Sequence, residues 1–304
     1  MAQLPNSEHS LHMLRRVAHL WAEHDREGAM QWGAAQEDPA VRQHALGGVV
    51  EIWAHTDPAA AAVFAAGLQG SYERLGALEV AARRWASQST VEAMEWAREL
   101  PVGDRQRATV AILREVAESD PGHAAAMYEE LTAELSPEGL QGGAYRRMAQ
   151  EIASVWSSSS PAEAAAWAVK LPEAGEVRRG AVADVAEHWL GFDSAAAGEW
   201  ILQLPEGRTR DAATERVVGT FVHTDPATAF SWASSASDEG HRFGMMREVL
   251  KRWQVTDPAA AQAALNAAEV PPEQRRELSE VFAALSPPAR ETAGDQEAAE
   301  QLPE

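Results

Sequence analysis

Residues 45–67 read ALGGVVEIWAHTDPAAAAVFAAG and contain the features that decide the fold. The apolar residues eight, seven, four and three positions before Trp53 are Ala45, Leu46, Val49 and Val50. This spacing is typical of an amphipathic α-helix. Asp57-Pro58 then predicts a second helix, because an N-cap carboxylate accepts a free backbone N–H and Pro suits the first helical position. The stretch therefore predicts a helical hairpin, with a helix A that ends near Trp53 and a helix B that begins after Asp57.

The hairpin recurs along most of the chain. The residues that correspond to Trp53, called anchors here, are Trp21, Trp53, Trp85, Val116, Trp156, Trp189, Phe221 and Trp253. The spacings between them are 32, 32, 31, 40, 33, 32 and 32 residues. A period of this length is typical of helical-hairpin arrays, in which each unit buries its open apolar face against the next.

Two further positions repeat in phase with the anchors. Eight residues after each anchor is a small residue: Ala29, Ala61, Ala93, Ala124, Ala164, Ala197, Ala229 and Ala261. Eleven residues after it is an aromatic one in most units: Trp32, Phe64, Trp96, Trp167, Trp200 and Trp232. We expect the alanines to allow close approach of neighbouring helices and the aromatic residues to fill the core between them. Leu-Pro pairs such as Leu100-Pro101 are expected to end helix B.

We predict an all-α fold, a right-handed α-solenoid of about eight antiparallel helical hairpins plus a C-terminal capping helix. The spacing of 40 residues and the glycines of SPEGLQGGAY predict a longer loop or hinge between two halves. The tail is polar, acidic and aperiodic, which favours disorder. The predicted parts are a disordered N-terminus 1–6, repeats one to four 7–135, the loop 136–144, repeats five to eight 145–269, the capping helix 270–286 and a disordered tail 287–304.

Composition limits the classes of partner. The 46 acidic and 26 basic residues give a formal net charge of -20, so phosphate backbones and anionic membranes are unfavourable partners. Cys is absent, which removes disulfides and thiolate chemistry but says nothing about compartment. No apolar stretch is long enough to span a bilayer, and the N-terminus lacks a signal-peptide pattern. As written the chain is expected to be cytoplasmic, or periplasmic or secreted if a leader has been removed; its localisation stays open.

The Asp57-Pro58, Ala61 and Leu100-Pro101 positions carry a family resemblance. The chain resembles tetratricopeptide-like and HEAT-like helical-hairpin arrays, and is similar to uncharacterised bacterial proteins with Asp-Pro…Ala…Trp…Leu-Pro repeats. It differs from the tetratricopeptide pattern in having its Trp at the end of helix A. The resemblance implies an α-solenoid and, by analogy, protein interaction.

An arginine recurs eleven residues before the anchor in six units: Arg42, Arg74, Arg105, Arg178, Arg210 and Arg242. One interpretation is a row of guanidinium groups that binds carboxylates or phosphates of an extended partner. The favoured interpretation is that each arginine caps the free carbonyls at the end of the preceding helix B. Arg178 should then reach the end of the helix that contains Trp167, and Arg210 the end of the helix that contains Trp200.

The tryptophans and histidines are candidates for ligand or metal binding, but structural roles explain them better. The tryptophans could form aromatic cages, but their phase with the apolar residues favours a core role. His9, His12, His19 and His24 lack a convergent third metal ligand, so we interpret them as surface residues and expect no metal site. No catalytic or phosphate-binding motif is present, so no cofactor and no enzyme activity is expected.

The remaining candidates concern a protein or peptide partner. The eighth unit is locally basic through Arg242, Arg247, Lys251 and Arg252, which we predict as possible partner-binding residues. The residues six before the anchors do not repeat, and we expect them to face solvent: Arg15, Gly47, Glu79, Val110, Gln150, Ala183, Glu215 and Arg247. An irregular surface of this kind favours a protein partner over a repeated ligand.

The leading hypothesis is a non-catalytic protein-interaction scaffold or adaptor that uses the solenoid surface. Two alternatives stay open at this point. The chain could be an accessory or sensor domain of a larger membrane or secreted protein, or an all-helical enzyme without a recognisable motif. The oligomeric state is unknown.

Overall fold

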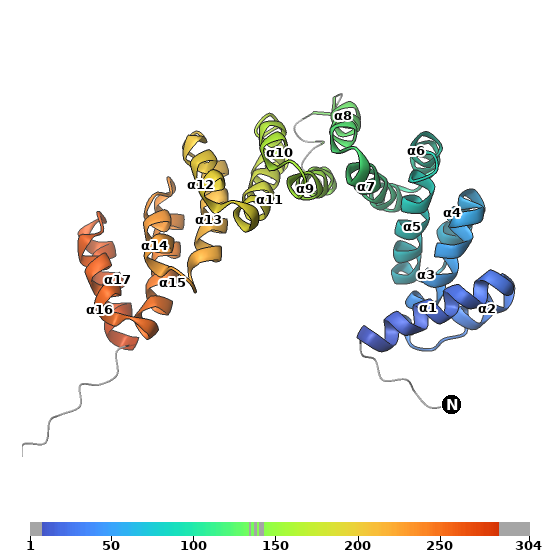
Figure 1. Cartoon of the computed structure of the whole chain (residues 1–304), viewed down its shortest axis with the longest axis horizontal. Helices are drawn as coiled ribbons and strands as arrows, with labels where there is room; N and C mark the ends of the chain where they lie inside the picture. The colour runs from blue at the N-terminus through green and yellow to red at the C-terminus, as the bar shows by residue number, and fades with distance from the viewer. Residues whose placement is uncertain (1–7, 134, 137–138, 140–142, 286–304) are drawn as a thin grey trace, which may run out of the picture. The chain divides into compact units, whose positions relative to one another are not determined.

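The computed structural model describes residues 8–133, 135–136, 139 and 143–285. These residues form α-helices joined by short turns, and no strand occurs among them (Figure 1). The all-α class is therefore confirmed. The chain divides into two compact units, residues 1–216 and residues 217–304.

The helices alternate between longer and shorter elements, as the hairpin pattern predicts. In the first unit they are α1 (Glu8–His24), α2 (Arg26–Ala34), α3 (Pro39–Thr56), α4 (Pro58–Gly67), α5 (Ser71–Ala86), α6 (Thr90–Glu99), α7 (Val102–Ser119), α8 (Pro121–Thr132), α9 (Ala144–Ser157), α10 (Pro161–Ala168), the short 3-10 helix η2 (Ala174–Glu176), α11 (Val177–Phe192) and α12 (Ser194–Gln203). Helix α13 (Arg208–Phe221) crosses the boundary between the units. The second unit continues with α14 (Pro226–Ser234), α15 (Glu239–Thr256), α16 (Pro258–Ala267) and α17 (Pro272–Leu285).

The predicted helix starts are confirmed at the Asp-Pro junctions. Asp57 Oδ1 accepts the backbone N–H of Ala60 at 3.0 Å, and Asp257 Oδ1 accepts that of Ala260 at 2.9 Å. Each Asp also ends the helix before it, because its own N–H donates to the carbonyl of the anchor, as Asp57 does to Trp53. One residue therefore closes helix A and opens helix B, which keeps the hairpin turn short.

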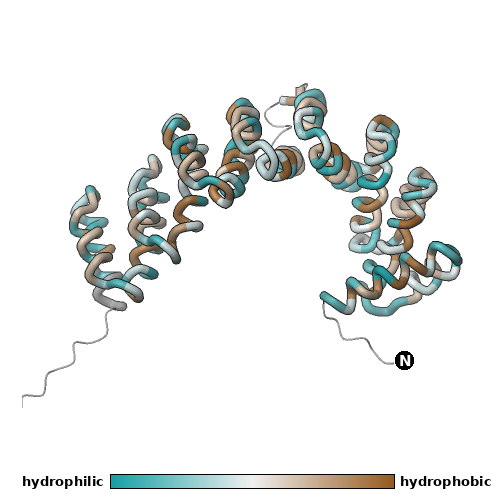
Figure 2. The backbone as a smooth tube through the Cα atoms, in the orientation of Figure 1, coloured by the Kyte–Doolittle hydropathy of each residue, from teal (hydrophilic) through white to brown (hydrophobic). Residues whose placement is uncertain are grey.

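In the first unit, each helix A contacts the next. The contacting pairs are α1 with α3, α3 with α5, α5 with α7, α7 with α9, and α9 with α11. Each helix A also contacts the helix B that follows it, from α1 with α2 to α11 with α12. Apolar and polar residues alternate along these helices rather than forming separate blocks (Figure 2). Each hairpin can thus bury one face and leave another in water.

The small residue eight positions after the anchor is completely buried in all eight hairpins. Ala29, Ala61, Ala93, Ala124, Ala164, Ala197, Ala229 and Ala261 each have 0% relative exposure. This confirms the predicted packing role, since a larger side chain at a fully enclosed position would push its neighbours apart.

The anchor and the aromatic residue eleven positions later form a ring pair within most hairpins of the first unit. The ring-centroid distances are 5.7 Å for Trp21–Trp32, 5.4 Å for Trp53–Phe64, 5.6 Å for Trp85–Trp96, 6.0 Å for Trp156–Trp167 and 5.7 Å for Trp189–Trp200. The rings hold helix A against helix B near the turn. Trp21 is the exception in burial, because 38% of it remains exposed.

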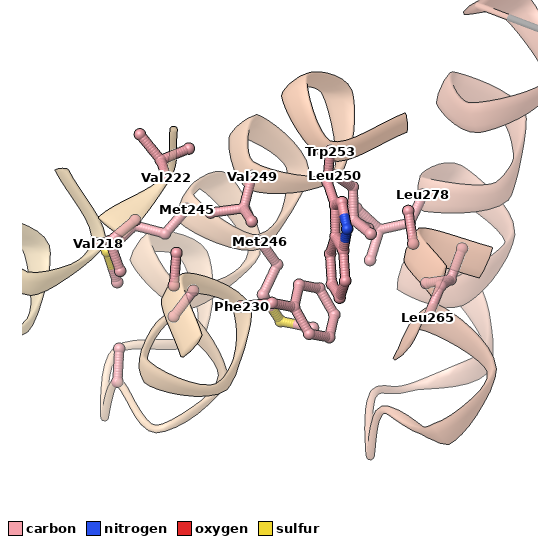
Figure 3. Packing of buried hydrophobic residues seen from close by; sticks show 14 residues of the cluster. Val218, Val222, Phe230, Met245, Met246, Val249, Leu250, Trp253, Leu265 and Leu278 are labelled. Carbon is pink, nitrogen blue, oxygen red and sulfur yellow. The ribbon is translucent and has the colours of Figure 1, made fainter. Parts of the chain in front are cut away.

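The second unit is built around Trp253 of α15. Phe230 of α14 lies 6.3 Å from its ring centroid, and Met246 packs beside both rings (Figure 3). Leu278 of α17 reaches the same core. Helix α17 lies within residues 270–286, where the capping helix is predicted, and it contacts α15 and α16. Its role as a cap stays a prediction.

The predicted longer loop at 136–144 is described only in part. Helix α8 ends at Thr132 and α9 begins at Ala144, after Gly143 with a φ of +33°. A positive φ favours glycine, which explains the residue at this position. The predicted disordered segments 1–6 and 287–304 lie outside the described residues.

Candidate protein-interaction surface

The exposed side of the helices A in the first unit is named here the helix-A surface. Its side chains are linked across neighbouring helices by ion pairs and hydrogen bonds. The first network joins α1, α3 and α5 through Glu51, whose carboxylate accepts from Arg15 at 3.0 Å and from Arg84 at 2.9 Å. Burial raises the pKa of Glu51, but the hydrogen bonds and charges of the two arginines outweigh it and lower that pKa overall.

A cavity of about 400 Å³ lies further along the helix-A surface, between α5, α7 and α9. Its apolar lining includes Leu75, Val110 and Ala111. Its charged lining is Glu79, Asp104, Arg107, Arg114, Arg147 and Glu151. We name it the α5/α7/α9 cavity. Apolar surface combined with a few charged groups is typical of a site that binds a side chain or short segment.

The charged groups of the α5/α7/α9 cavity are only loosely paired. Arg107 lies 3.4 Å from Glu79, and Arg114 lies 3.6 Å from Glu151. Arg147 is exposed, and its side chain has no hydrogen-bond or ion-pair partner within the described part of the chain. The rim therefore offers a guanidinium group to a ligand without first breaking an existing pair.

A second network connects α9, α11 and α13. Asp184 accepts from Gln150 Nε2 at 2.9 Å and lies 3.9 Å from Arg216. Burial raises the pKa of Asp184, and the hydrogen bond from Gln150 and the charge of Arg216 lower it too little to cancel that effect. The helix-A surface is thus a row of interhelical polar contacts on both sides of the cavity.

The expectation that the residue six before the anchor faces solvent is wrong in two hairpins. Gly47 and Ala183 are buried at this position. The surface instead includes other positions, among them Glu51 and Arg114, two residues before their anchors. The exposed face of helix A is therefore broader than this single position.

The capping role predicted for the repeated arginines is confirmed in five of the six cases. Each donates to a carbonyl at or just after the end of the preceding helix B. The bonds are Arg42 to Gln36 (2.5 Å), Arg74 to Leu68 (3.2 Å), Arg105 to Arg98 (3.4 Å), Arg178 to Leu171 (2.6 Å) and Arg242 to Ala236 (2.8 Å). These guanidinium groups therefore satisfy free helix-end carbonyls and do not form an open ladder for a ligand.

Arg210 does not follow the prediction. Its Nη1 lies 3.9 Å from Glu206, and its buried Nε has no hydrogen-bond partner in the region that the structure describes. The preceding turn contains Gly207 with a φ of +135°, a backbone conformation that the other arginine-containing turns do not share.

A sixth capping arginine was not predicted from the sequence. Arg275 of α17 donates to the carbonyls of Leu265 (3.3 Å), Asn266 (2.8 Å) and Ala268 (2.5 Å) at the end of α16. The anchor-based count could not find it, because the ninth helix A has no aromatic anchor. Its distance of 33 residues from Arg242 was the available signal.

Replacing Arg178 with Gln should lower the free energy of unfolding by about 1 kcal/mol, because the Leu171 carbonyl loses its donor. Arg208→Gln is the control, since Arg208 is exposed and makes no polar contact among the described residues. Urea unfolding followed by circular dichroism measures both. Equal stability of the two variants would contradict the capping role.

The structure separates the four predicted partner-binding residues of α15. Arg242 is committed to the Ala236 carbonyl, and Arg252 donates to Glu248 at 2.8 Å and contacts His223 at 2.9 Å. Arg247 lies over the Phe243 ring at 5.8 Å. Lys251 is exposed and makes no polar contact within the described residues. Only Arg247 and Lys251, four residues apart, share a helix face. Of the four residues, these two stay predicted as possible partner-binding residues.

The other candidates have simple environments. His9, His12 and His24 are exposed, and His19 lies 3.8 Å from Glu23. No group of three potential metal ligands occurs in the part of the chain that the structure describes. Of its helices, none has the length and apolar character required to cross a bilayer.

The chain was also compared with known proteins. Neither a protein-family model nor a curated protein matches its sequence.

Proposed function

We propose that the chain is a protein-interaction scaffold. In this proposal it is a right-handed α-solenoid of about eight helical hairpins with a capping helix, and its helix-A surface binds an extended segment of a protein or peptide. The serial contacts from α1 to α11 support the solenoid, because each helix A can only stack in this way if neighbouring hairpins share one orientation.

The observation that carries the proposal is the α5/α7/α9 cavity with Arg147 at its rim. Three helices from successive hairpins contribute to it, so a segment that lies across them contacts several repeats at once. An apolar side chain of that segment packs against Leu75 and Val110, and a carboxylate pairs with Arg147. The chain's net charge of -20 favours a protein segment over nucleic acid or an anionic membrane.

The test is selection of a displayed library of random extended peptides against the intact chain. We expect the selected peptides to contain an acidic residue next to an apolar one. Arg147→Glu should weaken their binding by about tenfold or more, because it replaces an attractive charge with a repulsive one. Val110→Asp should weaken binding as well, since it places a charge in the apolar lining of the cavity.

Glu95→Arg is the matched control, because Glu95 is exposed on α6, a helix B, and lies outside the cavity lining. It changes the net charge by the same magnitude as Arg147→Glu, in the opposite direction. Isothermal titration calorimetry with one selected peptide compares the variants. Peptides whose affinity is unchanged by both cavity variants would place binding elsewhere and refute the proposal.

A further inference from the structure

Helix α1 exposes a stripe of apolar side chains. Met13 and Val17 are each 53% exposed, Leu20 is 51% exposed and Trp21 is 38% exposed. Their spacing of four, three and one residues places all of them on one side of the helix. We name this stripe the α1 apolar face. Four neighbouring apolar side chains on one helix form a patch, unlike single exposed residues.

The residues at the corresponding positions of the other hairpins are buried. Met13 and Val17 lie eight and four residues before their anchor. The residues eight before the anchor elsewhere in the first unit are Ala45, Ala77, Ala108, Met148, Ala181 and Ala213, and those four before it are Val49, Ala81, Ile112, Ile152 and Val185. All eleven are apolar and at most 3% exposed. These positions form the face on which hairpins stack, and on α1 the described residues leave that face uncovered.

A terminal hairpin in a helical array normally presents a polar outer face, which keeps it soluble. Helix α1 keeps the stacking pattern instead, although exposed apolar surface costs about 25 cal/mol per Å². Among the described residues, nothing covers this face. A helix from outside the described residues would cover it.

We propose that the α1 apolar face binds the α1 apolar face of a second copy of this chain, in an antiparallel helix pair. Centred near Val17, such a pair brings Met13 of each copy against Leu20 and Trp21 of the other. The contact is self-complementary, as a two-fold symmetric interface requires. This inference does not depend on the peptide-binding function proposed for the helix-A surface.

Charge and hydrogen bonding both favour this arrangement. Residues 8–24 contain two arginines and two acidic residues, so this helix carries no net formal charge in a chain of net charge -20. Two copies meet here with less repulsion than at an acidic surface. His12 and Glu23 lie eleven residues, about three turns, apart and share one edge of the helix. Antiparallel pairing places Glu23 of each copy beside His12 of the other.

Sedimentation equilibrium on the full chain over a wide concentration range tests the proposal. We expect a monomer–dimer equilibrium, and we expect Val17→Asp to raise the dissociation constant by about a hundredfold, because it buries two unpaired carboxylates at the centre of the contact. Val91→Asp is the matched control and should leave dimerisation unchanged, since Val91 is a comparably exposed valine on α6. Circular dichroism verifies that both variants remain folded.

A charge exchange distinguishes this pairing from other contacts through the same residues. Glu23→Lys should weaken the dimer, and His12→Glu combined with Glu23→Lys should restore it, because the pair is rebuilt with reversed polarity. A chain that stays monomeric at the highest concentration would overturn the proposal. So would a dimer that Val17→Asp leaves intact, or a double variant that fails to regain the affinity lost in Glu23→Lys.

Discussion

Replacing Trp167 with Ala should lower the free energy of unfolding by about 3–5 kcal/mol, the range for loss of a large buried aromatic side chain. Trp167 of α10 is 6% exposed. Its ring lies 6.0 Å from Trp156 in the same hairpin and 6.0 Å from Tyr128 of α8 in the preceding hairpin, in an edge-to-face arrangement. Its Nε1 also donates to Glu129 at 3.2 Å.

The position of Trp167 makes this the largest expected loss. The indole contacts the hairpins on either side of the segment between α8 and α9, so its removal opens a cavity and removes a contact between two repeats. In a repeat array the loss can unfold a group of hairpins before the rest. We expect urea unfolding, followed by circular dichroism, to show a lower midpoint and a broader transition than in the parent chain.

Phe192→Ala is the control for Trp167→Ala. Phe192 is also aromatic, but 69% of it is exposed at the end of α11. Little buried area is lost there, so the free energy of unfolding should change by less than about 0.5 kcal/mol. Comparable losses in the two variants would show that Trp167 does not connect the hairpins energetically.

Replacing Gly48 with Ala should destabilise the chain by about 1–3 kcal/mol, although alanine is the better helix former. Gly48 lies in α3 and faces the backbone of α1. A Cβ atom at this position would overlap the backbone carbonyl oxygen of Arg15 and approach the backbone N of His19. Backbone atoms cannot rotate away, so α1 and α3 must separate and lose packing.

The neighbouring residue provides the control. A Cβ atom on Gly47 meets nothing within 4 Å, so Gly47→Ala should stabilise α3 by up to about 1 kcal/mol through helix propensity alone. Both variants replace one glycine of α3 with alanine, so they have the same amino-acid composition. Thermal unfolding of both should therefore shift the midpoint in opposite directions, and a shift in the same direction would contradict the close approach.

Much of the fold could be predicted from the sequence because its rules are local. The Asp57-Pro58 junction specifies a helix start through one side-chain hydrogen bond and one fixed φ angle. The alanine eight residues after each anchor marks an enclosed position, since the periodicity of the helix fixes which way it faces. The arginine caps followed from the same reasoning, because the helix ends they serve are close in sequence.

The candidate site depended on contacts between distant residues. Glu51 pairs with Arg15 and Arg84, which are 36 and 33 residues away, and these positions differ from one hairpin to the next. The repeat period therefore gives no rule for such pairs. Arg210 shows the same limit, since it lacks the cap that the repeat period predicted for it.

The sequence by itself determined the helices, their ends and the residues that face the core, because hydrogen bonds and side-chain periodicity act within a few residues. Only the tertiary structure decided which charged residues meet on the helix-A surface and where the α5/α7/α9 cavity lies. It also decided that Met13 and Val17 are exposed, although the sequence gives them the same apolar pattern as their buried counterparts. Burial depends on whether a neighbouring helix is present, and that information is absent from the local pattern.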